Sequence, residues 1–144
     1  MNFSIEIGPA TDLETIPALK DVYITMLPGG DFRETADQAE NLVKKGFNPI
    51  PHIPARSIEN EVQLKEYVSR CRDGGTKQVL VIGGSREPVG DFDSSIQLLE
   101  TGYFEDMKIG IAGHPEGSPD ISDSKLEKAM NDKKPYADYI VTQW

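Results

Sequence analysis

The chain begins with apolar residues at every second position, since Phe3, Ile5 and Ile7 alternate with polar side chains. A period of two is typical of a β-strand with one buried face. Five later apolar runs predict further strands, at residues 22–27, 48–56, 79–82, 109–112 and 137–143. The run at residues 79–82 is apolar at every position, which favours a parallel strand that is covered on both faces.

Segments with helical spacing separate these strands. The pattern predicts a short helix that begins near Thr11 and runs to about Lys20, because an N-cap residue and an acidic first turn come together there. Longer helices are predicted at residues 32–45, 57–72, 96–99 and 124–133. The buried face predicted for the second of these consists of Val62, Leu64, Tyr67 and Val68. Alternating strands and helices predict one α/β domain with a parallel sheet.

This alternation leaves two architectures open. One is a (β/α)8 barrel, and the other is an open, doubly wound sheet of the flavodoxin type, whose usual size fits 144 residues. In both, functional groups gather where the strands end. The six predicted strands end at polar or glycine positions, which are Glu6, Thr25, His52, Gly83-Gly84-Ser85, His114 and Gln143.

Composition narrows the classes of partner. A net charge of -9, from 24 acidic and 15 basic residues, repels phosphate backbones and anionic lipids, so neither nucleic acid nor a membrane surface is expected as a partner. Cys71 is the single cysteine, which excludes an intramolecular disulfide and a multi-cysteine zinc site. No signal-like start or membrane-length apolar run is present. A cytoplasmic location is therefore expected.

Glu6 is the first candidate for chemistry. Alternation places it on the face opposite Ile5 and Ile7, and in a barrel that face points inward. We therefore expect Glu6 in an enclosed, poorly solvated mouth, where burial raises the pKa of a carboxyl group and allows it to act as a general acid. The competing interpretation is a solvated carboxylate, one among the 24 acidic residues.

Other strand ends carry groups that suit a ligand. His52 lies between two prolines, where an imidazole can contact a phosphate or a ring edge, although a packed structural histidine is the alternative. Bare backbone amides at Gly83 and Gly84 suit a flat ring or a phosphate, whereas a plain βα turn explains the same glycines. A metal hydrolase would need more ligands than His52 and His114 supply, so no metal is expected.

Taken together, these segments resemble the methylenetetrahydrofolate reductase family, flavoproteins built on a (β/α)8 barrel. Residues 3–9 look like the opening strand of that family, whose glutamate is the general acid. Thr25 matches a second-strand threonine near the flavin, and His52 matches a Pro-His segment beside the cofactor. Residues 113–120 are similar to the fifth-strand signature, and residues 137–143 to a segment whose final glutamine contacts the folate or nicotinamide.

The resemblance implies a TIM-barrel-type domain over residues 1–144 that contains about the first six strands. It also implies an NAD(P)H-dependent oxidoreductase with FAD that reduces methylenetetrahydrofolate to methyltetrahydrofolate, in the one-carbon metabolism that supplies methionine biosynthesis. Glu6 would be catalytic, and Thr25 and Gln143 would bind the folate. The cofactor-binding residues implied are Thr25, His52, Gly83, Gly84, Ser85, Ala112, His114, Ser118 and Lys133.

Three positions depart from the family pattern. Ser85 stands where the family has an aspartate near the flavin and the pterin, His114 stands in place of a tyrosine, and Ser118 in place of a histidine. These changes favour, as an alternative, a flavin-independent folate-binding or one-carbon-transfer relative. Because a barrel of this type closes with eight strands, we also expect self-association or completion of the barrel by another chain, or else an inactive barrel fragment.

Overall fold

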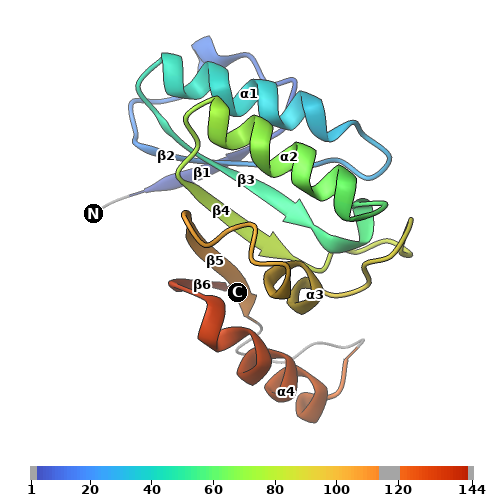
Figure 1. Ribbon diagram of the computed structural model, residues 1–144. Coiled ribbons are helices and arrows are strands. Elements are labelled where there is room, and N and C mark those ends of the chain that lie inside the picture. Colours follow the sequence, from blue (N-terminus) through green and yellow to red (C-terminus); the bar gives the residue numbers. More distant parts are fainter. Residues whose placement is uncertain (1–2, 114–120, 143–144) are drawn as a thin grey trace.

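The computed structural model describes residues 3–113 and 121–142. Its parallel strands follow one another in sequential order and curl into a half-barrel (Figure 1). They are β1 (Ser4–Ile7), β2 (Asp21–Ile24), β3 (Asn48–Pro54), β4 (Gln78–Ile82), β5 (Lys108–Gly113) and β6 (Tyr139–Thr142). The predicted barrel-type sheet is confirmed, since a flavodoxin-like sheet would have the strand order 2-1-3-4-5.

Helices connect the strands and cover the outer face of the sheet. The α-helices are α1 (Phe32–Lys44), α2 (Glu61–Asp73), α3 (Ser95–Glu100) and α4 (Asp123–Lys133). The described residues also form three short 3-10 helices, which are η1 (Leu13–Thr15) between β1 and β2, η2 (Ala55–Ser57) between β3 and α2, and η3 (Lys134–Tyr136) between α4 and β6. No helix within residues 3–113 and 121–142 combines the length and the hydropathy that a membrane span requires.

Helices α1 and α2 form a packed layer, in which they lie side by side (Figure 1). The face of α1 that carries Ala39 and Leu42 packs on β1 and β2. Helix α2 buries Leu64, Tyr67, Val68 and Cys71 in the larger apolar cluster of the protein. These four positions follow the i, i+3, i+4, i+7 spacing of one helix face.

Two sequence predictions about helices are wrong. The helix expected to extend to Lys20 is a single 3-10 turn, because Pro17 disfavours helical geometry at Ile16, which is extended. Val62 was placed on the buried face of α2, but it is 78% exposed. Since Val62 lies two residues before Leu64, it is rotated by about 200° to the opposite side of the helix.

The inner face of the half-barrel carries a layer of hydrogen-bonded polar side chains. Asp21, Asn48 and Gln78 are each the first residue of a strand. Nδ2 of Asn48 donates to Oδ1 of Asp21 and to Oε1 of Gln78, at 3.0 Å in each case. Gln78 in turn donates from Nε2 to the hydroxyl of Tyr139 at 2.8 Å. The layer therefore ties β2, β3, β4 and β6 together across the inner face.

The described sheet has two edge strands, β1 and β6. Large apolar side chains are exposed at both edges. Phe3, next to β1, is 69% exposed, and Ile140 on β6 is 50% exposed. Edge strands with exposed apolar groups favour pairing with another chain. Self-association remains a prediction.

Candidate active site

Two residues singled out in separate strands meet on the inner face. Glu6 lies on β1 and His52 on β3, and Oε2 of Glu6 is 3.8 Å from Nε2 of His52. The intervening strand β2 pairs with both β1 and β3. A separation of 3.8 Å exceeds the usual length of a hydrogen bond but leaves the two groups in electrostatic contact. The fold therefore brings a carboxylate and an imidazole to one place.

His52 is the more buried member of this pair. Its side chain is 11% exposed, and burial lowers the pKa of the imidazole, while the carboxylate of Glu6 partly offsets that effect. The imidazole is therefore neutral at pH 7. Within the described part of the chain, Nε2 is buried and has no hydrogen-bond partner. Buried polar atoms normally have partners, so this nitrogen is available to a ligand.

Glu6 is in a different environment from the one expected. Its side chain is 57% exposed, so the prediction of an enclosed, poorly solvated carboxyl group is wrong for the described residues. The physical reason is topological, because β1 is an edge strand and no described strand covers its outer side. The assignment of Glu6 as a general acid remains a prediction.

Thr25 follows β2 directly and is half-buried. Its hydroxyl donates to the carbonyl oxygen of Ile7 at 3.3 Å, and its own carbonyl accepts from the hydroxyl of Thr35 at 3.2 Å. These bonds fix the end of β2 against β1 and α1. The hydroxyl oxygen of Thr25 retains acceptor capacity for a ligand.

The end of β4 forms an open backbone turn. Gly84 has a φ of +94°, a conformation that favours glycine, and the carbonyl of Gly83 accepts from the backbone N–H of Arg56 at 2.9 Å. Gly83 itself has no such φ, and a Cβ added there would meet no atom within 4 Å. The backbone conformation of the turn therefore explains why glycine occurs at position 84, but it does not explain the glycine at position 83. Ser85 is exposed.

Lys133 lies at the end of α4 and contacts β5. Its Nζ donates to the carbonyl oxygen of Ala112 at 3.3 Å, so two of the cofactor-binding residues implied by the resemblance are in direct contact. Burial lowers the pKa of Lys133. The residues that line an adjacent groove of about 180 Å³ between α3 and α4 are Ser94, Ser95, Ile96, Lys125, Lys128, Ala129, Asp132 and Lys133.

Lysines outnumber acidic residues in the lining of this groove, although the protein as a whole is acidic. Three lysines and one aspartate, Asp132, line the groove. Asp132 pairs with Lys128 at 2.7 Å. Such a groove suits an anionic group. Lys133 is among the residues predicted from the sequence, whereas Lys125 and Lys128 are not, although their i, i+3 spacing on a predicted helix places them on one face.

Three predicted site residues, His114, Ser118 and Gln143, lie outside the described residues. The inner-face residues Tyr23, Gln78 and Tyr139 were not singled out from the sequence. In the part of the chain that the structure describes, no group of three or more His, Cys, Asp or Glu residues is placed to hold a metal ion.

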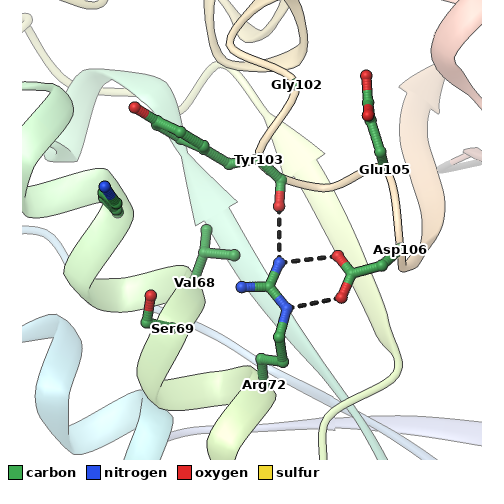
Figure 2. Close-up of a pocket in the computed structure, with 8 residues that line it drawn as sticks. Val68, Ser69, Arg72, Gly102, Tyr103, Glu105 and Asp106 are labelled. Atoms are coloured by element: carbon green, nitrogen blue, oxygen red, sulfur yellow. Dashed lines mark hydrogen bonds and ion pairs between the residues drawn. The ribbon is translucent and has the colours of Figure 1, made fainter.

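A second pocket, of about 390 Å³, lies between α2 and the segment that precedes β5 (Figure 2). Arg72 dominates it, donating to both carboxylate oxygens of Asp106 at 2.6 and 2.7 Å and to the carbonyl of Tyr103 at 2.9 Å. The pKa of Asp106 is lowered by the hydrogen bond from Arg72. None of the predicted site residues that the structure describes lines this pocket, and the bonds of Arg72 join α2 to the chain before β5.

Comparisons with known proteins found similarity in sequence and in structure. No family model matches the chain. Methylenetetrahydrofolate reductase 1 of Schizosaccharomyces pombe is 26% identical over 138 residues, which cover 85% of this chain and 22% of that protein. The chain thus spans about a fifth of the length of that relative. The YdjI aldolase from Escherichia coli K12 aligns with a TM-score of 0.45 at 13% identity, over 87% of this chain and 46% of that one.

Proposed function

We propose that this chain belongs to a flavin-dependent oxidoreductase of one-carbon metabolism that resembles methylenetetrahydrofolate reductase. The observation that carries the proposal is the contact between Glu6 and His52, 3.8 Å apart on β1 and β3. Both residues were singled out for the same site from separate segments of the sequence. Sequence similarity to a reductase of that name supports the same assignment.

The described residues fit a flavin in three respects. Nε2 of His52 is buried and unpartnered within the described chain, which suits a hydrogen bond to a heteroatom of a ring. The space beside Gly83 is open to a flat group. Lys125 and Lys133 line a groove that suits phosphate groups. When bound, FAD would accept a hydride from NAD(P)H and pass it to the folate.

Glu6 is the residue that supplies a proton in this proposal. Opening the ring of methylenetetrahydrofolate requires a proton on the departing nitrogen, and a carboxyl group within hydrogen-bond reach can donate it. Because Glu6 is 57% exposed, a bound substrate can reach its carboxyl group. Thr25 and Gln143 would orient the folate.

His52 has a supporting role. The imidazole of His52 is buried and lies 3.8 Å from the carboxyl group of Glu6. The same burial holds the ring in a fixed position beside the carboxyl group.

A flavin-independent relative that binds folate is the second candidate, and Ser85 favours it. Ser85 is exposed at the end of β4 and has no charge, where the family pattern places an aspartate near the flavin. An absorbance spectrum of the purified protein separates the two candidates. Visible absorbance by bound flavin supports the first, and folate binding without it supports the second.

The decisive test of the first candidate is Glu6→Gln, measured in two half-reactions. Reduction of flavin by NAD(P)H should be nearly unchanged, whereas reoxidation of the flavin by methylenetetrahydrofolate should slow by about 100-fold or more, because only that step needs the proton. Glu14→Gln is the matched control, since Glu14 is an exposed carboxylate that pairs with Lys45 far from His52. Equal loss of both half-reactions in Glu6→Gln would contradict the proposed role.

A further inference from the structure

We propose that Tyr139 is a positioning residue, which holds the Glu6–His52 pair from the other end of the sheet through the ring of Tyr23. The effect that we expect this role of Tyr139 to have on catalysis rests on the proposed function. The contacts that hold the Glu6–His52 pair do not depend on that function. Tyr139 lies on β6, whereas Glu6 lies on β1 at the opposite edge of the described sheet. The contacts between them follow from the curl of the half-barrel.

The first contact depends on the absence of a side chain at Gly110. Tyr139 is paired in register with Gly110 of β5, and a Cβ at Gly110 would overlap the phenol ring. The ring therefore lies across β5 and reaches the inner side chains of more distant strands. There the hydroxyl of Tyr139 accepts from Nε2 of Gln78 at 2.8 Å and from the hydroxyl of Tyr23 at 3.4 Å.

The second contact joins Tyr23 to the candidate site. The rings of Tyr23 and His52 lie edge to face, with centroids 6.2 Å apart and planes at 67°. Nε2 of His52 then lies 3.8 Å from the carboxylate of Glu6. A continuous series of side-chain contacts therefore runs from Tyr139 through Tyr23 and His52 to Glu6.

The hydroxyl of Tyr139, and not only its ring, is needed for this arrangement. Two donors from β4 and β2 converge on that oxygen, and the ammonium group of Lys108 lies 5.2 Å from the ring centroid. Burial raises the pKa of Tyr139, so the phenol is neutral at physiological pH. Replacing the hydroxyl by hydrogen leaves the ring over Gly110 but removes both hydrogen bonds.

Loss of these hydrogen bonds should change the packing and solvation of the His52 ring. Without its acceptor, Tyr23 is free to turn, and the edge-to-face contact that shields one side of the imidazole weakens. Among the described residues, the titratable groups in contact with the His52 ring are Glu6 from β1 and Tyr23 from β2. Since burial lowers the pKa of His52, added solvation should move that pKa upward.

The test is a proton NMR titration of the full chain, which contains two histidines, with His114→Gln used to assign the His52 signals. In Tyr139→Phe the ring-proton signals of His52 should shift and its titration midpoint should rise. Tyr23→Phe removes only the bond between the two hydroxyls, so it should move the same signals in the same direction and by less. Tyr103→Phe is the matched control, because that hydroxyl bonds to Glu61 on the outer surface.

An unchanged His52 signal in Tyr139→Phe, with a circular dichroism spectrum of the folded protein, would overturn the proposal. If Tyr139→Phe does not fold, an unchanged signal in Tyr23→Phe has the same meaning. The proposed function fails separately, when the wild-type protein lacks flavin and folate reduction although His52 responds to both substitutions. Where reduction is present, Tyr139→Phe should lower the rate of the folate half-reaction several-fold and leave the NAD(P)H half-reaction intact.

Discussion

Helices α2 and α4 have similar lengths but differ in what they bury. Helix α2 has 13 residues and buries Leu64, Tyr67, Val68 and Cys71, whereas α4 has 11 residues and buries none. Helix α1, beside α2, buries six residues. Most helical stability in proteins comes from packing of an apolar face, so α1 and α2 should carry the stability of the domain and α4 little of it.

The weakly packed helix is also the one that presents lysines to a groove. Lys125, Lys128 and Lys133 line the space between α3 and α4, and the hydrogen bond from Lys133 to Ala112 attaches the end of α4 to β5. Regions with few buried apolar contacts open locally at low cost in free energy. The well-packed core and the lysine-lined groove thus lie on different helices.

The largest effect that tests this division is the loss of a buried leucine. Leu42 on α1 is 0% exposed, and Leu42→Ala should lower the free energy of unfolding by about 2–5 kcal/mol, because it leaves a cavity in the core. Leu126→Ala makes the same chemical change on α4, where the side chain is only half-buried. Its cost should be about 1 kcal/mol or less. Urea unfolding of both variants measures the difference.

Equal destabilisation by these two substitutions would contradict the difference between the helices, because it would mean that α4 is as well packed as α1. A change in the slope of the urea transition would indicate instead that the unfolded ensemble had changed. The comparison therefore requires equal slopes as well as different midpoints.

A smaller effect concerns the starts of the helices. The side chain of Asn60 accepts from the backbone N–H of Gln63 at 2.9 Å, which caps α2. Ser122 occupies the same position before α4 without a side-chain capping bond. Asn60→Ala should therefore destabilise the protein by about 1 kcal/mol, and Ser122→Ala by about 0.3 kcal/mol or less. A cost of Ser122→Ala equal to that of Asn60→Ala would show that α4 is capped as firmly as α2.

Much of the fold could be predicted from local patterns. Alternation, glycine positions and helical spacing located the six strands and four α-helices that lie within the described residues, and the roughly regular spacing of strands indicated βαβ units. Two errors concerned single positions, namely the end of one helix and the buried face of another. Pro17 stopped the helix expected to run to Lys20, and the phase of α2 placed Val62 on the exposed side.

The candidate site could be predicted less completely, because its geometry depends on the curl of the sheet. Position along the strands was enough to single out Glu6 and His52, and the structure brings them together. The contact between Tyr23 and Tyr139 spans 116 positions and needs the absence of a side chain at Gly110, which no local pattern indicates. The exposure of Glu6 depended on which strand lies at the edge, and this is a property of the assembled sheet.

The smallest expected effects are electrostatic, and they distinguish the two regions by pH. His52, beneath the α1–α2 layer, and Lys133, on α4, are both bases whose pKa is lowered by burial, from ordinary values of 6.5 and 10.5. For such a base the unfolded chain holds the proton at pH values where the folded chain has lost it. Stability therefore rises with pH between the folded pKa and the ordinary value of each group.

We expect two separate rises in the free energy of unfolding, one that ends near pH 6.5 for His52 and one that ends near pH 10.5 for Lys133. His52→Gln should flatten only the acidic rise, and Lys133→Met only the alkaline one, because each variant removes a single buried base. Urea unfolding across both pH ranges measures these slopes. A His52→Gln profile that matches the wild type below pH 6.5 would show that His52 is as well solvated as in the unfolded chain. Phosphate at the lysine groove should restore the charge of Lys133 and flatten the alkaline rise of the wild type, while leaving the acidic rise of His52 unchanged.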